Sequence, residues 1–283
     1  MCFFGSQFAP RMRYRIVAIL ACLLAMAGVT AARAADCAQF GAGNRLPTLD
    51  NAQLAAQTQI LCNARFAVLH SSLAHEPLWS AEHLDAPMVR AAMSTPRQGD
   101  FHPDPRIPSP FRAELEDYVR SGFDRGHMTP SGDMPDRQAQ EESFALSNIV
   151  PQRAELNRGR WADIESAVRR LALREGELYV VTGPAFHTRT IAMIGPDRVL
   201  VPTSTWKAVY DPRRRQTGVY VCHNAARNPG CSHVSVVLLT HVTGIDPFPA
   251  LPPSMKQVCM TLPFGRMRAP RRTRHTRHTR WLW

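Results

Sequence analysis

The chain contains 283 residues, 45% of them hydrophobic, and carries a formal net charge of +11. This length suits one globular domain with a sizeable core, or at most two small ones. Residues 1 to 34 hold four arginines and residues 266 to 283 hold seven, with no acid in either, so residues 35 to 265 are neutral on balance. The basic composition therefore cannot by itself identify a nucleic-acid-binding protein.

The first 34 residues are predicted to be a secretory signal peptide. Three arginines precede the apolar run "IVAILACLLAMAGV", and "AARA" follows it with an A-x-A cleavage pattern. The alternative is a membrane anchor, but about 14 apolar residues are few against the roughly 20 that a span requires. No second apolar stretch is long enough to cross a membrane. We therefore expect a secreted or periplasmic protein whose mature domain covers residues 35 to 265.

Five cysteines remain after the predicted cleavage, in an exported chain where disulfides can form. They are Cys37, Cys62, Cys222, Cys231 and Cys259. Four cysteines allow three connectivities, and we favour the two local pairs, which leaves Cys259 unpaired. A zinc site at the second pair is the alternative, since His223 and His233 lie beside it. Short C-x-x-C and H-x-x-x-H spacings are absent, which disfavours zinc.

The first part of the mature chain predicts a short helix and two neighbouring strands. The helix falls in "DNAQLAAQTQ", and the apolar run "ARFAVLHS" predicts a strand with "PLWSAEHL" returning beside it. Residues 94 to 112 are rich in proline and cannot form a regular helix, so they predict a long surface loop. Loops of this length in compact domains are often functional.

The second part predicts a long helix among strands. "QAQEESFALSNIVPQ" predicts a short helix or turn that runs into an apolar strand. Residues 154 to 176 place Trp161, Ile164, Val168 and Leu171 at helical spacing, and this amphipathic helix ends near Gly176. The segments "ELYVVTGPAF", "RVLVPTSTWKAVYD" (interrupted by proline), "TGVYVCHNA" and "HVSVVLLTHVTGI" predict strands, and "DPFPALPPSMKQ" leads into a final short helix. Strands mixed with few helices indicate an α+β fold, followed by an Arg-rich tail over residues 266 to 283 that is predicted to be disordered.

Two polar residues mark one face of the long helix. Asn157 lies at its start and Glu165 eight residues later, just over two turns, so both side chains project from nearly the same face. An amide oxygen and a carboxylate are ligand types that Mg²⁺ accepts, and Mg²⁺ needs few protein ligands because it keeps several waters. Taken alone, the two residues are more simply a helix cap and a solvated glutamate.

The stretch "SGFDRGHMTPSGDM" places His127 close to Arg125. A neutral imidazole can take a proton from water near neutral pH. A cation polarises phosphate, and an arginine stabilises the negative charge that develops during phosphodiester hydrolysis. Read alone, His127 is more simply a structural histidine in a polar turn.

Three ordered blocks carry a resemblance that decides between these alternatives. "DRGHM", "LSNIVPQ" and "LNRGRWADIE" closely resemble the DNA/RNA non-specific endonucleases with a ββα-metal (His-Me finger) site, which include secreted Serratia-type nucleases and mitochondrial endonuclease G. "FHPDP" looks most like the endonuclease G branch, and the similarity runs from about residue 60 to residue 262. The implied fold is a mixed antiparallel sheet with helices, in which His127 ends the β-hairpin and the following helix carries Asn157.

The resemblance also implies roles for individual residues. His127 corresponds to the general base, Asn157 to the direct Mg²⁺ ligand, and Glu165 to the carboxylate that holds the metal's water shell. The supporting residues, which contact phosphate or orient the histidine, are Arg125, Asn148 and, as a weaker match, Arg97. Asp124 is expected to brace the loop rather than bind metal, with Asp133 likewise no ligand. Arg158 stands where relatives often have Gln, and we expect little consequence from that departure.

These roles predict a Mg²⁺-dependent, sugar-non-specific endonuclease that hydrolyses DNA and RNA, in which Mn²⁺ could replace Mg²⁺ and which could form a homodimer. Two other hypotheses stay open at this point. One is a non-catalytic nucleic-acid or surface binder that uses the arginine tail. The other is a hydrolase of a different phosphodiester, for example a cyclic or lipid-linked one.

Overall fold

The computed structural model describes residues 37–264. The predicted signal peptide over residues 1 to 34 and the Arg-rich tail over residues 266 to 283 lie outside this range and stay predictions. Within residues 37–264, no helix combines the length and apolar character needed to cross a membrane.

The strands are β1 (Thr48–Leu49), β2 (Thr58–Cys62), β3 (Phe66–Ser71), β4 (Glu76–Asp85), β5 (Asp124–His127), β6 (Ile149–Gln152), β7 (Glu177–Ala185), β8 (Met193–Ile194), β9 (Val199–Leu200), β10 (Ser204–Asp211), β11 (Gln216–His223), β12 (Cys231–Val234) and β13 (Ile245–Asp246). The α-helices are α3 (Ala52–Ala55), α4 (Ala86–Ser94), α5 (Arg137–Ser143), α6 (Ala162–Glu175), α7 (Val236–Thr243) and α8 (Pro253–Gln257). Short 3₁₀ turns are η1 (Ala38–Phe40), η2 (Ala42–Asn44), η3 (Ser109–Phe111), η4 (Leu115–Tyr118), η5 (Ser131–Asp133) and η6 (Leu146–Asn148), and η7 (Leu156–Trp161) is a π-helical segment.

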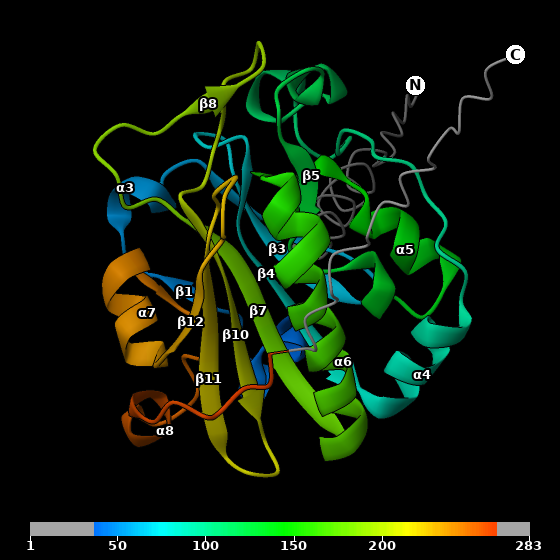
Figure 1. Cartoon of the computed structure of the whole chain (residues 1–283), viewed down its shortest axis with the longest axis vertical. Helices are drawn as coiled ribbons and strands as arrows, with labels where there is room; N and C mark the ends of the chain where they lie inside the picture. Colours follow the sequence, from blue (N-terminus) through cyan, green and yellow to red (C-terminus); the bar gives the residue numbers. More distant parts are fainter. Residues whose placement is uncertain (1–36, 265–283) are drawn as a thin grey trace, which may run out of the picture.

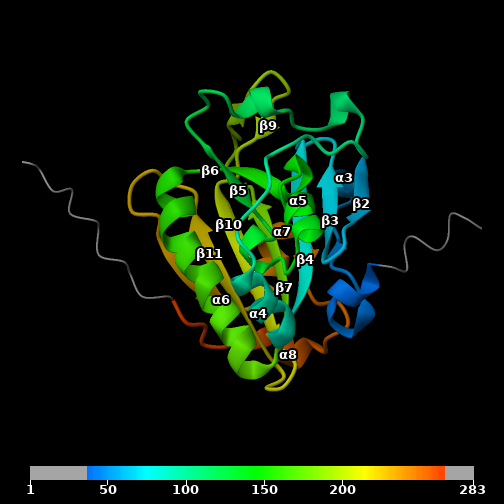
Figure 2. The ribbon, with the colours of Figure 1, turned by 90° about the vertical axis from the view of Figure 1, so that its right-hand side faces the viewer.

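A seven-stranded sheet in the order β12-β11-β10-β7-β4-β3-β2 forms the centre of the fold, and its neighbouring strands are antiparallel (Figure 1). Helices cover both faces: α6 and α4 lie on one side of the sheet, and α7 and α8 lie on the other (Figures 1 and 2). The predicted α+β class with an antiparallel sheet and helices is confirmed.

Alternation along the strands divides the core between the two faces. In β3, Phe66 and Val68 belong to the cluster beneath α6 and α4, whereas Ala67 and Leu69 belong to the cluster on the opposite face. Successive side chains of a strand point to opposite faces, so a strand buried on both sides reads as a continuous apolar run. This explains why "ARFAVLHS" predicted a strand without alternating polarity.

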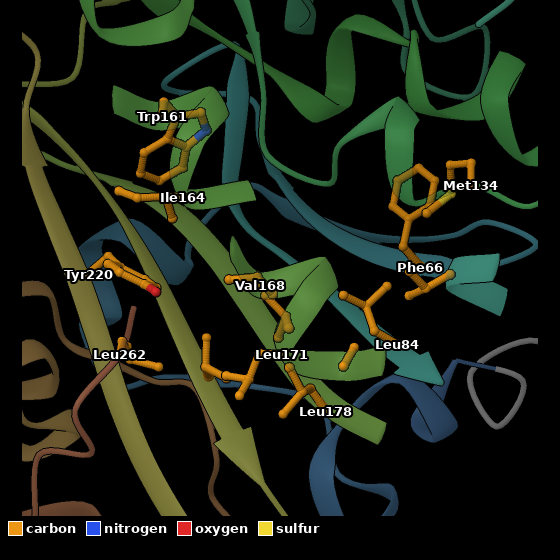
Figure 3. Close-up of a cluster of buried hydrophobic side chains, with 14 of the residues drawn as sticks. Phe66, Leu84, Met134, Trp161, Ile164, Val168, Leu171, Leu178, Tyr220 and Leu262 are labelled. Carbon is orange, nitrogen blue, oxygen red and sulfur yellow. The ribbon is translucent and has the colours of Figure 1, made fainter. Parts of the chain in front are cut away.

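The helix α6 buries the predicted stripe against the sheet. Trp161, Ile164, Val168 and Leu171 follow one another along its inner side, with Leu178 of β7 beneath them (Figure 3). Each of the four is at most 3% exposed. Burying such side chains contributes about 1.5–3 kcal/mol each relative to exposure, so this stripe fixes the helix against the sheet.

The strands β5 and β6 and the helical segment that follows them, η7 and α6, form a ββα unit. β5 pairs with β6 in antiparallel register, with His127 opposite Ile149, and the chain then enters η7 and α6. His127 therefore ends the first strand of a two-stranded unit, as predicted. After α4 ends at Ser94, the proline-rich residues up to 112 contain the short turn η3 and one isolated bridge from His102 to Ala145, and otherwise form the predicted loop.

The segment "HVSVVLLTHVTGI" was predicted to be a strand, and this prediction is wrong for most of its length. Only Cys231–Val234 is extended, and Val236–Thr243 is the helix α7. The side chain of Ser235 accepts a hydrogen bond from the backbone N–H of Leu238, and Gly244 ends the helix with φ of 70°. These N- and C-terminal caps outweigh the β-propensity of the valines. The helix α4 was not predicted at all, although Asp85 caps it in the same manner.

Both favoured disulfides are present. Cys37 pairs with Cys62 and Cys222 with Cys231, leaving Cys259 free and exposed. The second pair joins cross-strand partners of β11 and β12. The two cysteines of the alternative zinc site are therefore engaged in a covalent bond.

Candidate active site

A cavity of about 470 Å³ opens where the ββα unit meets the loop of residues 94 to 112. Five of the six residues predicted for the site line it: Arg97, Arg125, His127, Asn157 and Glu165. They come from the loop, β5, η7 and α6, and span almost 70 positions of sequence. The remaining one, Asn148, does not line the cavity.

His127 forms part of the cavity wall and packs against aromatic rings. Its ring lies edge-on to Phe144 with centroids 5.0 Å apart, and it is tilted against Phe101 at 5.3 Å. The residue is 8% exposed, and burial together with the positive charge of Arg97 lowers its pKa to about 3. The imidazole is therefore neutral across the physiological range, the state in which it can accept a proton.

Gly126 lets the strand that carries His127 lie close to its partner. A Cβ at this position would lie 2.4 Å from the side-chain oxygen of Gln152 and 2.7 Å from its Cβ. Gln152 belongs to β6 and is itself fully buried. The glycine between Arg125 and His127 is thus required by close packing of the ββ unit.

Asn148 acts on the backbone that follows His127. Its side-chain oxygen accepts from the N–H of Thr129, and its amide nitrogen donates to the carbonyls of Thr129 and Ser143. The side chain is fully buried, so direct contact with phosphate, one of its two predicted roles, is not open to it. Orienting the segment around His127 is the role that these bonds allow.

Asn157 is held by Asp124. Its amide Nδ2 donates to Asp124 Oδ2 at 3.0 Å, so this contact occupies the nitrogen of the amide and not its oxygen. Asp124 also accepts two hydrogen bonds from Arg158, at 2.7 and 2.5 Å, and the Arg158 pair is the main cause that lowers the pKa of Asp124. The predicted bracing role of Asp124 agrees with this geometry. Arg158, from which little consequence was expected, forms a two-pronged ion pair with the carboxylate that holds Asn157, while its own side chain is largely exposed.

The π-helical turn of η7 changes how Asn157 is presented. Leu156–Trp161 winds more widely than an α-helix, and Gly159 departs from helical dihedrals with φ of −111° and ψ of −108°. π-Bulges inside helices are frequent at functional sites because the inserted residue re-aims its neighbours. Asn157 and Glu165 both line the cavity despite this deviation from regular spacing.

Glu165 lies in the cavity wall near the charged side chains of Lys207 and Arg169. Burial raises its pKa to about 7, against the opposing positive charges of Lys207 and Arg169. Arg169 follows Glu165 by four residues and donates to Asp133 at 2.5 Å. Asp133 is thereby engaged in an ion pair.

The cavity is positively charged overall. Four arginines line it, Arg97, Arg125, Arg158 and Arg169, against the two carboxylates Asp124 and Glu165. Arg125 lies over the ring of Phe101 at 4.5 Å and Arg97 over that of Phe144 at 5.0 Å. Stacking on aromatic faces leaves the guanidinium edges available to phosphate oxygens.

The donor set fits a hard cation held by few protein atoms. Asn157 contributes an amide oxygen not used by Asp124, and Glu165 a carboxylate in the same cavity. Among residues 37–264 no three or more His, Cys, Asp or Glu side chains converge as a metal-binding group. Oxygen donors of this kind, few in number, are what a hard divalent cation that keeps several waters accepts.

Several residues at this site were not predicted. Phe101, Tyr118 and Arg169 line the cavity, and Lys207 lies buried behind it. Arg169 could have been found from its i,i+4 spacing to Glu165, a typical helical ion-pair spacing. Lys207 had a different signal, since it is a charged residue inside the apolar strand "STWKAVY".

Comparison with known proteins gives consistent matches. The sequence model of the family described as DNA/RNA non-specific endonuclease matches residues 48–254. The mitochondrial nuclease EXOG of Danio rerio is 38% identical over 196 residues, covering 62% of this chain and 56% of that protein. The mitochondrial nuclease of Saccharomyces cerevisiae is 30% identical over 217 residues, covering 68% and 66%. The chain spans about half the length of the first curated relatives it matches, between 44% and 56%.

A solved structure shares the fold. The crystal structure of the EndoG/EndoGI complex, which concerns the mechanism of EndoG inhibition, matches with a TM-score of 0.65 and 27% identity. The match covers 77% of this chain and 91% of the other.

The relatives correct one prediction. A secreted or periplasmic location was expected from the N-terminal pattern, but the EXOG proteins and the yeast nucleases carry mitochondrial names. These relatives point away from export, so the predicted location is wrong. A basic, acid-free leader with an apolar run does not by itself determine the compartment.

Proposed function

This chain belongs to the DNA/RNA non-specific endonuclease family, and on that premise we propose that it is a metal-dependent nuclease that hydrolyses phosphodiester bonds in DNA and RNA. The observation that carries the proposal is the convergence of His127, Asn157, Glu165 and two arginines on one positively charged cavity. Cleavage without sequence preference requires contacts to phosphate and not to base edges, and four arginines in the lining suit that requirement.

His127 is the proposed general base. Its neutral ring takes a proton from a water molecule, whose oxygen attacks the phosphorus atom. With a pKa of about 3 the ring is always available but weakly basic. A phosphodiester in the cavity adds negative charge beside the ring, which raises the pKa of His127 towards the range where base catalysis is efficient.

The arginines and the residues that would hold the metal have the remaining roles in the proposed reaction. Arg125 and Arg97 bind the phosphate and stabilise the negative charge that develops on its oxygens. Asn157 and Glu165 would hold the cation, with Asp124 fixing the Asn157 amide. When bound, Mg²⁺, or Mn²⁺ in its place, polarises the phosphate and stabilises the leaving oxygen.

The test is a cleavage assay on the purified protein. Supercoiled plasmid and a long RNA are incubated with Mg²⁺, with Mn²⁺ and with EDTA, and both polymers should be cleaved only with metal. His127→Ala should lower the rate by about 10²–10⁴-fold. The matched control is His241→Ala, since His241 is exposed on α7 away from the cavity.

Two results would reject the proposal. Cleavage that persists in EDTA would show that the reaction does not depend on a metal. Full activity of His127→Ala would show that His127 is not the general base. Binding of nucleic acid with no cleavage under any metal would instead support the non-catalytic alternative.

A further inference from the structure

Lys207 is a buried charge behind the cavity. It is 1% exposed in β10, between β11 and β7 in the middle of the sheet. The whole sequence contains only two lysines among 34 basic residues, and the other, Lys256, forms an ion pair with Asp246 near α8. Burying an ammonium group costs several kcal/mol unless hydrogen bonds and opposite charges compensate it, so its contacts need an explanation.

The register of the sheet places Lys207 in a polar row. Lys207 of β10 pairs with Thr182 of β7, and Thr182 pairs with Ser80 of β4. All three are at most 1% exposed and share the face of the sheet on which the ββα unit lies. One step along each strand on that face lie the buried Glu82 of β4, Val180 of β7 and Val209 of β10. Val180 and Val209, with Leu84 one step beyond Glu82, belong to the apolar cluster beneath α6. This face is therefore apolar beneath α6 and polar beside it.

The polar row receives the backbone that follows His127. Lys207 Nζ donates to the carbonyl of Met128 at 3.4 Å and to Thr182 Oγ1 at 2.6 Å. Ser80 Oγ shares a hydrogen bond of 2.6 Å with Thr129 Oγ1. The two residues immediately after the proposed base are thus attached to the central sheet by two separate members of the row.

The ammonium group of Lys207 also lies near the residues proposed to hold the metal. Its nitrogen lies 5.6 Å from the ring centroid of Trp161, at the start of the helix that carries Glu165. Its positive charge acts on the carboxylates of Glu165 and Glu82. Lys207 is therefore the one residue of the row that contacts the strand of the base, the sheet and the helix of the carboxylate.

We propose that Lys207 is a positioning residue of the active site, which fixes the distance between His127 and Glu165 by tying the backbone after His127 to the central sheet. A compact ammonium with three donors on a flexible stem can serve these separate contacts at once. Because Lys207 does not reach the cavity surface, its removal changes the rate of the bound complex and not the affinity for nucleic acid. The proposal rests on the proposed nuclease function.

The experiment compares Lys207→Met with Lys256→Met, which removes the other lysine. Since a misplacement of about 1 Å can cost about 10²-fold in rate, Lys207→Met should lower kcat by about 10- to 100-fold with KM within about twofold of wild type. Lys256→Met should leave both unchanged. A kcat within twofold of wild type, or a loss confined to KM, would overturn the proposal.

A second pair of variants keeps the test decisive if Lys207→Met does not fold. Thr182→Val removes the acceptor of the 2.6 Å bond at nearly constant shape, whereas Thr182→Ser keeps the hydroxyl. Thr182→Val should lower kcat severalfold, whereas Thr182→Ser should keep kcat near that of wild type. In the Lys207→Met background, Thr182→Val should lower kcat little further, because both substitutions remove the same hydrogen bond between Lys207 and Thr182. Equal kcat for the two Thr182 variants would contradict the inference.

One further measurement separates this inference from the proposed function. The amide of Thr129 follows the Met128 carbonyl, so its NMR resonance should shift in Lys207→Met and stay in place in Lys256→Met. A wild-type protein without nuclease activity would reject the proposed function and leave this test valid. An unshifted Thr129 amide would reject the positioning role whatever the activity.

Discussion

Glu165→Gln is expected to weaken activity and at the same time to stabilise the metal-free protein at neutral pH. Burial raises the pKa of Glu165 from 4.5 to about 7. The folded state therefore binds the proton more tightly than the unfolded state, and this contribution to stability is fully present below pH 4.5. It is lost as the pH rises towards 7, and above pH 7 the ionised carboxylate carries the whole penalty.

The magnitude follows from that shift. A shift of about 2.5 pH units corresponds to about 3 kcal/mol at 1.36 kcal/mol per unit. Glu165 is only partly buried because it faces the cavity, and solvent there reduces the penalty, so we expect about 1–3 kcal/mol. Glutamine has nearly the same shape and no charge, so it avoids this penalty at every pH.

The assay is guanidinium unfolding of both proteins in EDTA at pH 4 and pH 8. The variant should be more stable at pH 8 by the amount above and equal to wild type at pH 4, while its kcat/KM with Mg²⁺ falls by about 10- to 100-fold. Addition of Mg²⁺ should stabilise wild type more than the variant. If Glu165→Gln were the less stable protein at pH 8, the carboxylate would not be under electrostatic strain and the reasoning would be refuted.

Three further predictions concern His127, Asp124 and Gly126. The imidazole resonances of His127 should show a neutral ring from pH 8 down to pH 5 in the metal-free protein, because burial and Arg97 hold its pKa near 3; an NMR midpoint near 6.5 would contradict this. Asp124→Ala removes the acceptor of the Asn157 amide and should weaken Mn²⁺ binding by about 10- to 100-fold in a calorimetric titration. Gly126→Ala should cost about 1–3 kcal/mol in denaturant unfolding because the new methyl group collides with Gln152; unchanged stability would show that the strands can separate.

Arg158→Gln is the control for the Asp124 variant. It removes the ion pair but leaves the hydrogen bond between Asp124 and the Asn157 amide in place. Mn²⁺ binding should therefore weaken less than in Asp124→Ala. Equal losses in both variants would mean that Mn²⁺ affinity depends on the ion pair and not on the orientation of the Asn157 amide.

Local patterns predicted most elements because they depend on neighbouring residues. Hydrophobic periodicity predicted the stripe from Trp161 to Leu171, and a continuous apolar run predicted β3. The short sequence separation of Cys222 and Cys231 predicted their disulfide. The errors arose where two local signals competed. In Val236–Thr243 the valines indicated a strand, while Ser235 and Gly244 capped a helix, and the caps prevailed because they satisfy backbone groups at the helix ends.

The residue types of the candidate site could be read from the sequence: a histidine beside an arginine, and an asparagine and a glutamate on a following helix. Their roles came from the resemblance of these blocks to a family. The type of each side chain and its spacing along one element are local properties, and so they can be read without coordinates. Arg97 also came from the sequence, although only the fold brings its loop to His127.

The groups that support these residues are visible only in the folded chain. The bonds from Asp124 to Asn157 and Arg158, from Asn148 to Thr129 and from Lys207 to Met128 join residues separated by 19 to 79 positions. Strand register and the packing of the ββα unit on the sheet set these contacts, and neither is encoded in local spacing. The burial that makes His127 neutral and raises the pKa of Glu165 has the same origin, because it is produced by the surrounding elements and not by the residues themselves.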